Sequence, residues 1–554
     1  MTTSNSPQSY TVGDYLLDRL NEIGIDELFG VPGDYNLHFL DHVIAHENIH
    51  WAGSANELNA GYSADGYARI KGIGALLTTY GVGELSATNA IAGSFAEFVP
   101  VVHIVGAPAK HIQAEHRRAH HSLGDGNFEH FARIAKEITC CVIDVEAPTA
   151  SAQIDHALSQ VLFHKRPGMI ILAADVAASP ATPPSTPLVR LEPVSSETAA
   201  TEFEAELRNF IQGKKVTVLA DILVHRDGAA DQLRSFLDKT GLPVTTLSWG
   251  KSLVDESLTN YVGTYSGSAS AEPVRVAVEN ADALMTIGVQ FTDNTTGGFT
   301  AKIDNEHRID LGRSEARIGN RVFAPLSIAT SLNITEQVIC ELHVEAMPFE
   351  KFDSNYTPIE LTDTPLQQDD LWQLVATHLN ASHIVLAEQG TSFFGLSQCR
   401  FPQGVTFVGQ PLWGSIGYTL PATVGAGLAD RNKRPVLFIG DGSAQLTIQE
   451  LGQMIREDIP AVVILINNDG YTVERAIHGM TASYNTIPAW RWDLALEFFG
   501  SDPTNHLVFK ATTSQELDFA LQTAMEHPGK LVLIEAVTDA QDIPSALDFV
   551  SSMG

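Results

Sequence analysis

The chain is short of cysteine, of basic residues and of long apolar runs. It has 4 cysteines in 554 residues, without CxxC or zinc-like spacing, which argues against a disulfide framework or a cysteine-based metal site. Lys and Arg number 34 against 66 Asp and Glu, and the net charge of -32 would repel nucleic-acid phosphates and anionic lipid. No apolar run approaches the roughly 20 residues that span a bilayer, and the opening MTTSNSPQSY does not resemble a signal peptide. We therefore expect a cytoplasmic protein with neither a nucleic-acid nor a membrane partner.

A complete dinucleotide-binding fingerprint is also missing. Gly81 and Gly83 form a GVG sequence, but the third glycine of GxGxxG does not follow. That glycine is part of the motif's physical mechanism, because it lets a helix pack closely against the strand. A dinucleotide-dependent oxidoreductase therefore ranks last among the enzyme classes considered.

What the chain does have is length and a repeated α/β pattern. At 554 residues it is too long for one hydrophobic core, and roughly three domains of about 150 to 200 residues are expected. Amphipathic stretches alternate with short apolar runs such as residues 101–105, 216–220 and 462–466. A proline-rich stretch at residues 179–196 and a loop-like stretch at about 347–370 would act as linkers. The expected fold is α/β, with largely parallel sheets flanked by helices in three consecutive domains at residues 1–178, 197–346 and 371–554.

Two turns in the third segment carry ligand types that suit Mg²⁺. GDGS follows one apolar strand, and Asn467-Asn468 follow the next. A right-handed crossover would make these strands parallel, so Asp441 and Asn468 would lie beyond the same edge of one sheet. Their carboxylate and amide oxygens suit Mg²⁺ shared with the phosphates of a ligand. The amides near Gly442 and Ser443, at a helix start, could receive a diphosphate.

The competing interpretation is that GDG is merely a turn. The chain contains a second GDG at residues 124–126, and no Asn-Asn pair follows that copy. Gly and Asp mark turns so often that GDG alone favours the turn. The full pattern at residues 440–468, framed by two strands, instead favours a site for Mg²⁺ and a diphosphate.

Glu57 is a carboxylate in an unusually uncharged neighbourhood. It follows the strand-like HWAGSA and is flanked by Asn56 and Leu58. An acid at a helix start is also favoured by the helix dipole alone. The residues themselves leave both a structural and a catalytic role open.

His120 and His121 stand in the polar stretch EHRRAHHSLGDGNFEH. His116 and His120 have the i, i+4 spacing of a zinc-binding helix face, but the HExxH glutamate and a nearby cysteine are absent. The other interpretation is proton transfer. With Asp34 of VPGDYNL, the two histidines could supply groups that titrate near neutrality.

In this order, GDYN, NELNA, HH and the GDGS–NNDG pair resemble the thiamine-diphosphate-dependent 2-keto acid decarboxylases. This family includes the pyruvate, indolepyruvate and branched-chain enzymes, and the resemblance to the branched-chain type is strongest. It covers almost the whole chain, from about residue 10 to residue 544. It implies thiamine diphosphate and Mg²⁺ as cofactors, a 2-keto acid substrate, and CO₂ and an aldehyde as products. It also implies a homodimer or homotetramer with active sites at subunit interfaces.

The resemblance carries roles over to individual positions. It implies the catalytic residues Asp34, Glu57, His120, His121 and Glu474, the cofactor contacts Glu57, Thr79, Thr391, Gly414, Ile416, Gly442, Ser443 and Asn468, and the Mg²⁺ ligands Asp441, Asn468 and the Gly470 carbonyl. Glu57 would contact the pyrimidine N1′, the Gly414 carbonyl would accept from the 4′-amino group, and Ile416 would hold the cofactor in its bent shape.

Substrate size rests on four aligned positions, which are Asn294, Phe393, Val473 and Ile477. Phe393 stands where pyruvate-specialised relatives tend to carry Trp, and Val473 is smaller than the Ile expected there. The pocket should therefore admit acids larger than pyruvate, with 2-ketoisovalerate and 2-ketoisocaproate favoured. A methylene changes discrimination by only about 1 to 3 kcal/mol, so pyruvate, phenylpyruvate and indolepyruvate stay open as alternatives. These apolar residues could also be core packing.

Two further classes remain as rivals. A thiamine-dependent carboligase would share the cofactor, but such enzymes generally lack the HH pair and often bind flavin in the middle domain. A non-catalytic protein that keeps the fold would need none of Glu57, Asp441 and Glu474 in particular. Their joint presence favours an enzyme.

Overall fold

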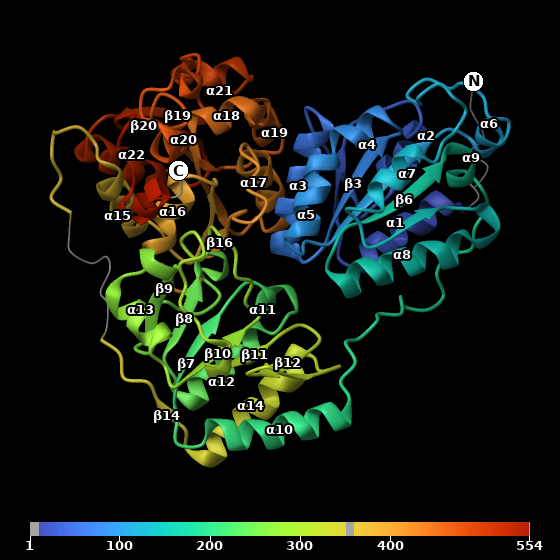
Figure 1. Ribbon diagram of the computed structural model, residues 1–554. Coiled ribbons are helices and arrows are strands. Elements are labelled where there is room, and N and C mark those ends of the chain that lie inside the picture. Colours follow the sequence, from blue (N-terminus) through green and yellow to red (C-terminus); the bar gives the residue numbers. More distant parts are fainter. Residues whose placement is uncertain (1–9, 351–358, 553–554) are drawn as a thin grey trace. The chain divides into compact units, whose positions relative to one another are not determined.

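The computed structural model describes residues 10–350 and 359–552, and Figure 1 follows the chain through them. Three β-sheets succeed one another along the sequence. Residues 351–358, part of the expected second linker, lie outside the described residues. Within the two described ranges, no helix is both long enough and apolar enough to cross a membrane.

The first sheet consists of six parallel strands in the order β2-β1-β3-β4-β6-β5. They are β1 (Glu27–Gly30), β2 (His50–Gly53), β3 (Gly74–Thr79), β4 (Val101–Ala107), β5 (Val142–Asp144) and β6 (Gly168–Ala173). Every residue of β3, β4 and β6 is buried, as expected for a parallel sheet with helices on both faces.

The helices of this region are α1 (Val12–Glu22), α2 (Leu37–Ala45), α3 (Glu57–Lys71), α4 (Val82–Ser86), α5 (Thr88–Ala96), α6 (Lys110–Ala114), α7 (His130–Ala135), α8 (Ala150–His164) and α9 (Ala174–Ala177). The bounds of α3 follow from its caps. The Asn56 side chain accepts a hydrogen bond from the Asn59 amide at 2.8 Å, and Gly72 ends the helix at φ 99°. Helix α3 therefore begins at Glu57, directly after β2.

The second sheet has the order β13-β12-β11-β10-β7-β8-β9, and β14 also pairs with β7. Its strands are β7 (Lys215–Ala220), β8 (Val244–Leu247), β9 (Tyr261–Tyr265), β10 (Ala283–Ile287), β11 (Arg308–Leu311), β12 (Ala316–Ile318), β13 (Arg321–Phe323) and β14 (Glu345–Ala346). The β11–β12 and β12–β13 pairs are antiparallel, and the other pairs are parallel. Its helices are α10 (Glu197–Ile211), α11 (Leu223–Arg226), α12 (Ala230–Thr240), α13 (Glu272–Glu279) and α14 (Ile328–Leu342).

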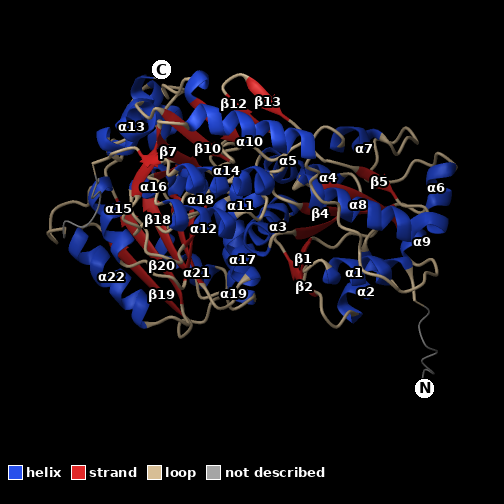
Figure 2. Ribbon diagram, turned by 90° about the horizontal axis from the view of Figure 1, so that it is seen from below, coloured by secondary structure: helices blue, strands red, loops and turns tan. Residues whose placement is uncertain are grey.

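The third sheet is again six parallel strands, in the order β16-β15-β17-β18-β20-β19. They are β15 (His383–Ala387), β16 (Thr406–Val408), β17 (Arg434–Gly440), β18 (Val462–Asn467), β19 (His506–Ala511) and β20 (Leu531–Val537). The helices are α15 (Gln368–Thr377), α16 (Thr391–Gln398), α17 (Thr419–Ala429), α18 (Asp441–Thr447), α19 (Leu451–Arg456), α20 (Thr472–His478), α21 (Ala495–Phe498) and α22 (Ser514–Glu526). In Figure 2 helices such as α15 and α22 lie beside the red strands of this sheet.

The first and third sheets share one topology. Numbered within each sheet, both run 2-1-3-4-6-5. In such open parallel sheets, ligands bind beyond the carboxyl ends of the strands near the point where the strand order reverses. By this rule, we expect ligand-binding residues in the loops after β1 to β4 and after β15 to β18.

By packing, the chain forms two compact units. One contains residues 1–192, 420–431 and 447–459, and the other contains residues 193–419, 432–446 and 460–554. The expected α/β class with three largely parallel sheets is confirmed. No helix or strand lies between Ala177 and Glu197, where the first linker was expected. The exact domain boundaries stay predictions.

Candidate active site

The loops after four neighbouring strands of the first sheet carry the residues predicted for its part of the site. Asp34 follows β1, Glu57 follows β2, Thr79 ends β3, and the His120-His121 pair follows β4. Because β2, β1, β3 and β4 are adjacent and parallel, these residues share one edge of the sheet. Residues far apart in sequence thus reach one edge of the sheet.

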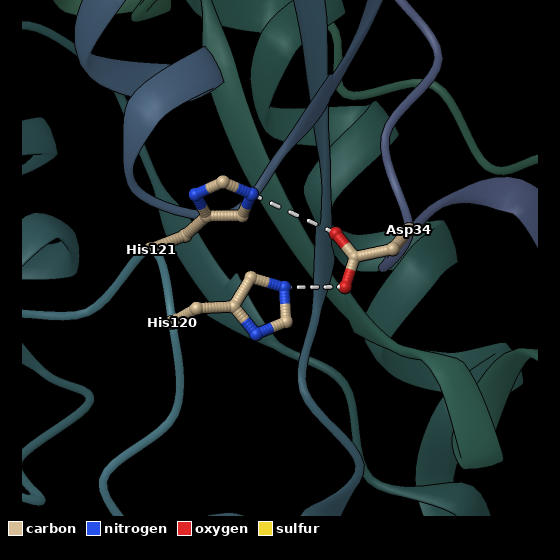
Figure 3. Close-up of side chains that lie close together, drawn as sticks. All are labelled: Asp34, His120 and His121. Atoms are coloured by element: carbon tan, nitrogen blue, oxygen red, sulfur yellow. Dashed lines mark hydrogen bonds and ion pairs between the residues drawn. The ribbon is translucent and has the colours of Figure 1, made fainter.

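Asp34 and the two histidines form one cluster (Figure 3). The His120 Nε2 lies 2.6 Å from Asp34 Oδ2, and the His121 Nε2 lies 3.7 Å from Asp34 Oδ1. The two imidazole rings are 4.6 Å apart between centroids. All three side chains keep solvent contact, with 46%, 61% and 32% of their side-chain areas exposed for Asp34, His120 and His121. An exposed carboxylate beside two imidazoles can exchange protons with a ligand, as general acid–base chemistry requires.

Their ligand atoms lie within 4.8 Å of one another, a spacing that a metal ion could also use. The helix face that the His116–His120 spacing would require is not formed, however, because α6 ends at Ala114. His116 Nδ1 lies 3.0 Å from the Gly126 carbonyl oxygen within its own loop, so His116 is not part of the cluster. The short His120–Asp34 contact is that of a charge-assisted hydrogen bond.

The histidine loop is held by close backbone packing. Gly81 has φ 66°, and a Cβ on it would lie 1.9 Å from the His121 carbonyl oxygen. His121 itself has φ 62°, a conformation that non-glycine residues adopt rarely. The main chain at His121 therefore packs closely against the turn that follows β3.

Glu57 is the first residue of α3 and is partly exposed. Its Oε1 would lie 3.2 Å from a Cβ on Gly83, so α4 approaches it closely. At the end of β3, the Thr79 Oγ1 is buried and has no hydrogen-bond partner among the described residues. A buried hydroxyl of this kind requires a partner, which a ligand can supply.

A second group of predicted residues lines a cavity of about 350 Å³ at the carboxyl edge of the third sheet. Its walls come from the loops after β16, β15, β17 and β18, together with a segment of the second sheet's region. The predicted residues on the wall are Asn294, Thr391, Gly414, Ile416, Gly442, Ser443, Asn468, Gly470, Val473, Glu474 and Ile477.

Asp441 joins the two turns that the sequence assigned to a metal. Its carboxylate accepts hydrogen bonds from the Gly442 amide at 2.8 Å and from the Gly470 amide at 3.1 Å. The side chain is almost fully buried, and burial raises the pKa of Asp441 to about 6. A carboxylate removed from water in this way is stabilised by a cation beside it. Asn468, also buried, lines the cavity next to Gly470.

Arg475 holds this turn and was not singled out in the sequence. From α20 its guanidinium donates to the Asn468 carbonyl at 3.0 Å and to the Asp469 carbonyl at 2.5 Å. It is also within 3.4 Å of the Asn485 carbonyl. An arginine directed at main-chain carbonyls has no short motif, so only its place one residue after Glu474 could have drawn attention to it.

Glu388, at the end of β15, is a second residue that sequence reasoning missed. Its carboxylate accepts hydrogen bonds from the Gly417 amide at 3.1 Å, from the Thr419 amide at 3.1 Å and from the Thr419 hydroxyl. Burial raises the pKa of Glu388 to about 7, and these hydrogen bonds act in the opposite direction. These hydrogen bonds hold the loop that carries Gly414 and Ile416. Glu388 itself also lines the cavity.

Phe393 does not line the cavity. It is fully buried in the core of the third sheet, with its ring 5.8 Å from the rings of both Phe394 and Phe407. Phe394 is on the cavity wall instead. The two residues are adjacent on α16 and point in different directions, and the one on the wall, Phe394, is not among the positions predicted from the sequence.

Gly470 should not tolerate a side chain. It has φ 118°, and a Cβ would lie 2.1 Å from the Asn485 carbonyl oxygen. We expect Gly470→Ala to lower the free energy of unfolding by about 1 to 3 kcal/mol or more, and to weaken cofactor binding. Thermal melting with and without thiamine diphosphate and Mg²⁺ would measure both effects.

Gly479→Ala is the matched control, because Gly479 also has positive φ, 147°, but nothing lies within 4 Å of a Cβ there. If the two variants melt alike and bind cofactor alike, the close approach to Asn485 has no importance.

The residues at the two edges fit thiamine diphosphate and Mg²⁺. Gly440 and Gly442 line the cavity, and no atom lies within 4 Å of a Cβ placed on Gly440, which leaves room beside the amides at the start of α18. The hard oxygen donors of Asp441 and Asn468 suit Mg²⁺. The orphaned Thr79 hydroxyl and the partly exposed Glu57 offer polar contacts at the other edge.

Comparisons with known proteins agree with this chemistry. Residues 10–127 match the thiamine pyrophosphate enzyme N-terminal TPP binding domain, residues 207–338 its central domain, and residues 389–536 its C-terminal TPP binding domain. The chain is 51% identical over 540 residues to an alpha-keto-acid decarboxylase of Mycobacterium ulcerans, covering 97% of this chain and 95% of the relative. It is also 51% identical over 552 residues to the alpha-keto-acid decarboxylase of Mycobacterium leprae, covering 99% of this chain and 96% of the relative.

A solved structure supports the fold. The thiamine diphosphate-dependent 4-hydroxybenzoylformate decarboxylase of Rhodococcus jostii RHA1 superposes with a TM-score of 0.76 at 20% identity, covering 96% of this chain and 99% of that chain. The family expected from the sequence is therefore confirmed, and so are the cofactors that it implies. This chain belongs to the thiamine-diphosphate-dependent alpha-keto-acid decarboxylases, which use thiamine diphosphate and Mg²⁺.

Proposed function

We propose that this decarboxylase acts on 2-keto acids larger than pyruvate, with the branched-chain acids 2-ketoisovalerate and 2-ketoisocaproate as its preferred substrates. The observation that carries this proposal is the composition of the cavity wall beside Glu474. Val473, Ile477 and Phe394 give it an apolar side. Apolar walls with a few polar groups favour ligands with an aliphatic side chain.

Mg²⁺ would be held by Asp441, the Asn468 side chain and the Gly470 carbonyl, and the diphosphate by the amides near Gly442 and Ser443. Thr391, Gly414 and Ile416 would contact the rest of thiamine diphosphate, together with Glu57 and Thr79. When bound, this cofactor supplies the electron sink that decarboxylation of a 2-keto acid needs. The contact of Asp441 with the Gly470 amide supports the Mg²⁺ site. The wall positions of Asn468, Gly442, Ser443, Thr391, Gly414 and Ile416 support their contacts with the cofactor.

The protein's own contribution is proton transfer and exclusion of water. Asp34, His120, His121 and Glu474 would form the acid–base set that protonates the reacting carbon after CO₂ leaves and then helps to release the aldehyde. The apolar wall of Val473 and Ile477 would keep water from that carbon, so that loss of the charged carboxylate is favoured. The exposed Asp34–histidine cluster supports the first of these roles.

We propose that the active site is completed by a second copy of this chain, in a homodimer or homotetramer. The acid–base cluster of the first sheet is exposed, as a group that meets a partner's cavity would be. On α4, which follows the Gly81 turn packed against His121, Val82 and Leu85 expose 53% and 41% of their areas. Apolar side chains next to a catalytic edge are typical of the buried centre of an obligate interface.

The cytoplasmic location also stays a prediction.

Val473→Ile should narrow the substrate range. The added methyl group enters the apolar side of the cavity, so kcat/KM for 2-ketoisocaproate should fall about tenfold relative to pyruvate. Steady-state aldehyde formation from both acids would measure the ratio. Val508→Ile, on the half-buried face of β19, adds the same methyl group elsewhere and should leave the ratio unchanged. An unchanged ratio in Val473→Ile would remove Val473 from the substrate pocket.

A further inference from the structure

His120 has a hydrogen-bond partner on each ring nitrogen. Nε2 faces Asp34 Oδ2 at 2.6 Å, and Nδ1 faces the Tyr35 hydroxyl at 3.1 Å. The same hydroxyl can donate to the His120 carbonyl oxygen at 3.3 Å. The Tyr35 ring also stacks on the His120 ring, with centroids 4.9 Å apart. Tyr35 is the tyrosine of the GDYN sequence, next to Asp34.

We propose that Tyr35 is a positioning residue that satisfies the His120 ring in both of its protonation states, and so lets this histidine gain and lose a proton while both ring nitrogens stay hydrogen-bonded. The role in catalysis rests on the proposed function of His120. The hydrogen-bond arrangement itself does not depend on it.

The charged state of His120 uses the Tyr35 hydroxyl as an acceptor. Both ring nitrogens of an imidazolium carry hydrogen and need acceptors. Nε2–H donates to the Asp34 carboxylate, and Nδ1–H donates to the Tyr35 oxygen. The hydroxyl hydrogen of Tyr35 then points to the His120 carbonyl. Every donor is matched in this arrangement.

The neutral state needs only a rotation of that hydroxyl. A bare Nε2 would face the negative Asp34, so the remaining hydrogen stays on Nε2 and the lone pair lies on Nδ1. The Tyr35 hydroxyl can turn from the carbonyl to donate to Nδ1. A hydroxyl can accept from Nδ1–H in the charged state and donate to Nδ1 in the neutral state, because it is both a donor and an acceptor.

A second histidine in the chain lacks this freedom. His130 Nε2 lies 2.7 Å from Asp125 Oδ2, the same pairing as His120 with Asp34. Its Nδ1, however, faces the guanidinium of Arg133 at 2.9 Å. A guanidinium can only donate, so it holds His130 Nδ1 without a hydrogen. The two pairs differ in the partner on Nδ1, and only His120 has a partner that suits both states.

Tyr35 is held in a position to act this way. In the same turn, the Asn36 side chain accepts from the Gly33 amide at 2.9 Å and donates to the Val31 carbonyl at 3.2 Å, which closes the turn around Asp34 and Tyr35. Partial burial and then the negative Asp34 raise the pKa of Tyr35, so its hydroxyl keeps its hydrogen at neutral pH. Among the described residues, the titratable groups in contact with His120 are Asp34, Tyr35 and His121.

Tyr35→Phe removes the hydroxyl and keeps the stacked ring. Because a hydrogen bond to a charged group is roughly twice as strong as one to a neutral group, the loss disfavours charged His120 more than neutral His120. We expect the pH at half-maximal acylation of His120 by diethylpyrocarbonate, measured by peptide mass mapping, to fall by about half a unit. The alkaline limb of the kcat profile should move in the same direction. At its optimum, kcat should fall about three- to tenfold while KM hardly changes, a small part of what acid–base catalysis contributes.

Two controls distinguish a specific effect of the Tyr35 hydroxyl on His120 from a general loss of structure. His130 acylation in the same samples should keep its midpoint. Tyr10→Phe removes a hydroxyl that donates to Asp18 at 2.6 Å in the same unit, and it should leave both the His120 midpoint and the kcat profile unchanged. Thermal melting would show that each variant is folded.

An unchanged or raised His120 midpoint in folded Tyr35→Phe would overturn the inference, whatever the activity. If the wild-type protein forms no aldehyde from any keto acid, the proposed function fails, and the acylation midpoint still decides the role of Tyr35. A lowered midpoint with an unchanged kcat profile would overturn the catalytic part of the inference.

Discussion

Asp441→Asn is expected to weaken binding of thiamine diphosphate and Mg²⁺ by at least about a hundredfold, which corresponds to about 2.8 kcal/mol, and to reduce aldehyde formation in proportion at limiting cofactor. The variant keeps the size of the side chain and loses its charge. The buried Asp441 carboxylate lies at the start of α18 and accepts from the Gly470 amide, so it is placed to join the diphosphate turn to the turn of Asn468. Titration of the metal-free protein with cofactor, followed by intrinsic fluorescence, would measure the affinity directly.

The chain supplies its own control for this prediction. Asp125 occupies the second GDG, where its carboxylate accepts from the Asn127 amide and pairs with His130. Asp125→Asn should leave cofactor affinity unchanged. If the two variants bind cofactor equally well, then the GDG at residues 440–442 is only a turn and the proposed metal site is wrong.

Glu57→Gln is expected to lower kcat by about a thousandfold or more while cofactor affinity changes by less than about tenfold. The amide keeps the volume and hydrogen-bonding reach of the side chain but cannot hold or receive the proton of a carboxyl group. Its proposed contact with the pyrimidine N1′ would therefore persist without activating the ring. Steady-state kinetics at saturating thiamine diphosphate, with bound cofactor measured separately, would distinguish binding from activation.

The structure also offers a test of the simpler explanation for Glu57. Glu57 and Glu197 are each the first residue of a helix, after the N-caps Asn56 and Ser196. An acid that only complements the helix dipole contributes about 0.3 to 1 kcal/mol to stability. Glu197→Gln should therefore cost a little stability and no activity. Should Glu57→Gln behave in the same way, Glu57 is a structural acid and the activating role is lost.

Much of the site could be predicted from the sequence because its residues follow strands. The apolar runs that became β17 and β18 placed Asp441 and Asn468 at one edge by the handedness of the crossover alone. The first four residues of HWAGSA form β2, and α3 starts soon after it, which places Glu57 at the corresponding edge of the first sheet. Local patterns of this kind depend on a few neighbouring residues and on general rules of sheet topology.

The residues that were missed depend on contacts that local patterns do not encode. Glu388 binds the Thr419 segment 31 residues away, and Arg475 binds the carbonyl of Asn485. Phe393 and Phe394 are adjacent and equally apolar, so the choice of the residue that faces the cavity depends on the rotation of α16 against its sheet. A close approach to Gly409 and Phe407 fixes Phe393 in the core. Only the tertiary structure supplies that information.

The central claim is tested most directly by aldehyde formation from pyruvate, 2-ketoisovalerate, 2-ketoisocaproate, phenylpyruvate and indolepyruvate, with and without added thiamine diphosphate and Mg²⁺. We predict turnover that requires both additions and a higher kcat/KM for the two branched acids than for pyruvate. A preference for pyruvate or for the aromatic acids would contradict the proposed substrate. Formation of no aldehyde from any acid, in protein that binds the cofactor, would contradict decarboxylation by this site and favour a carboligase.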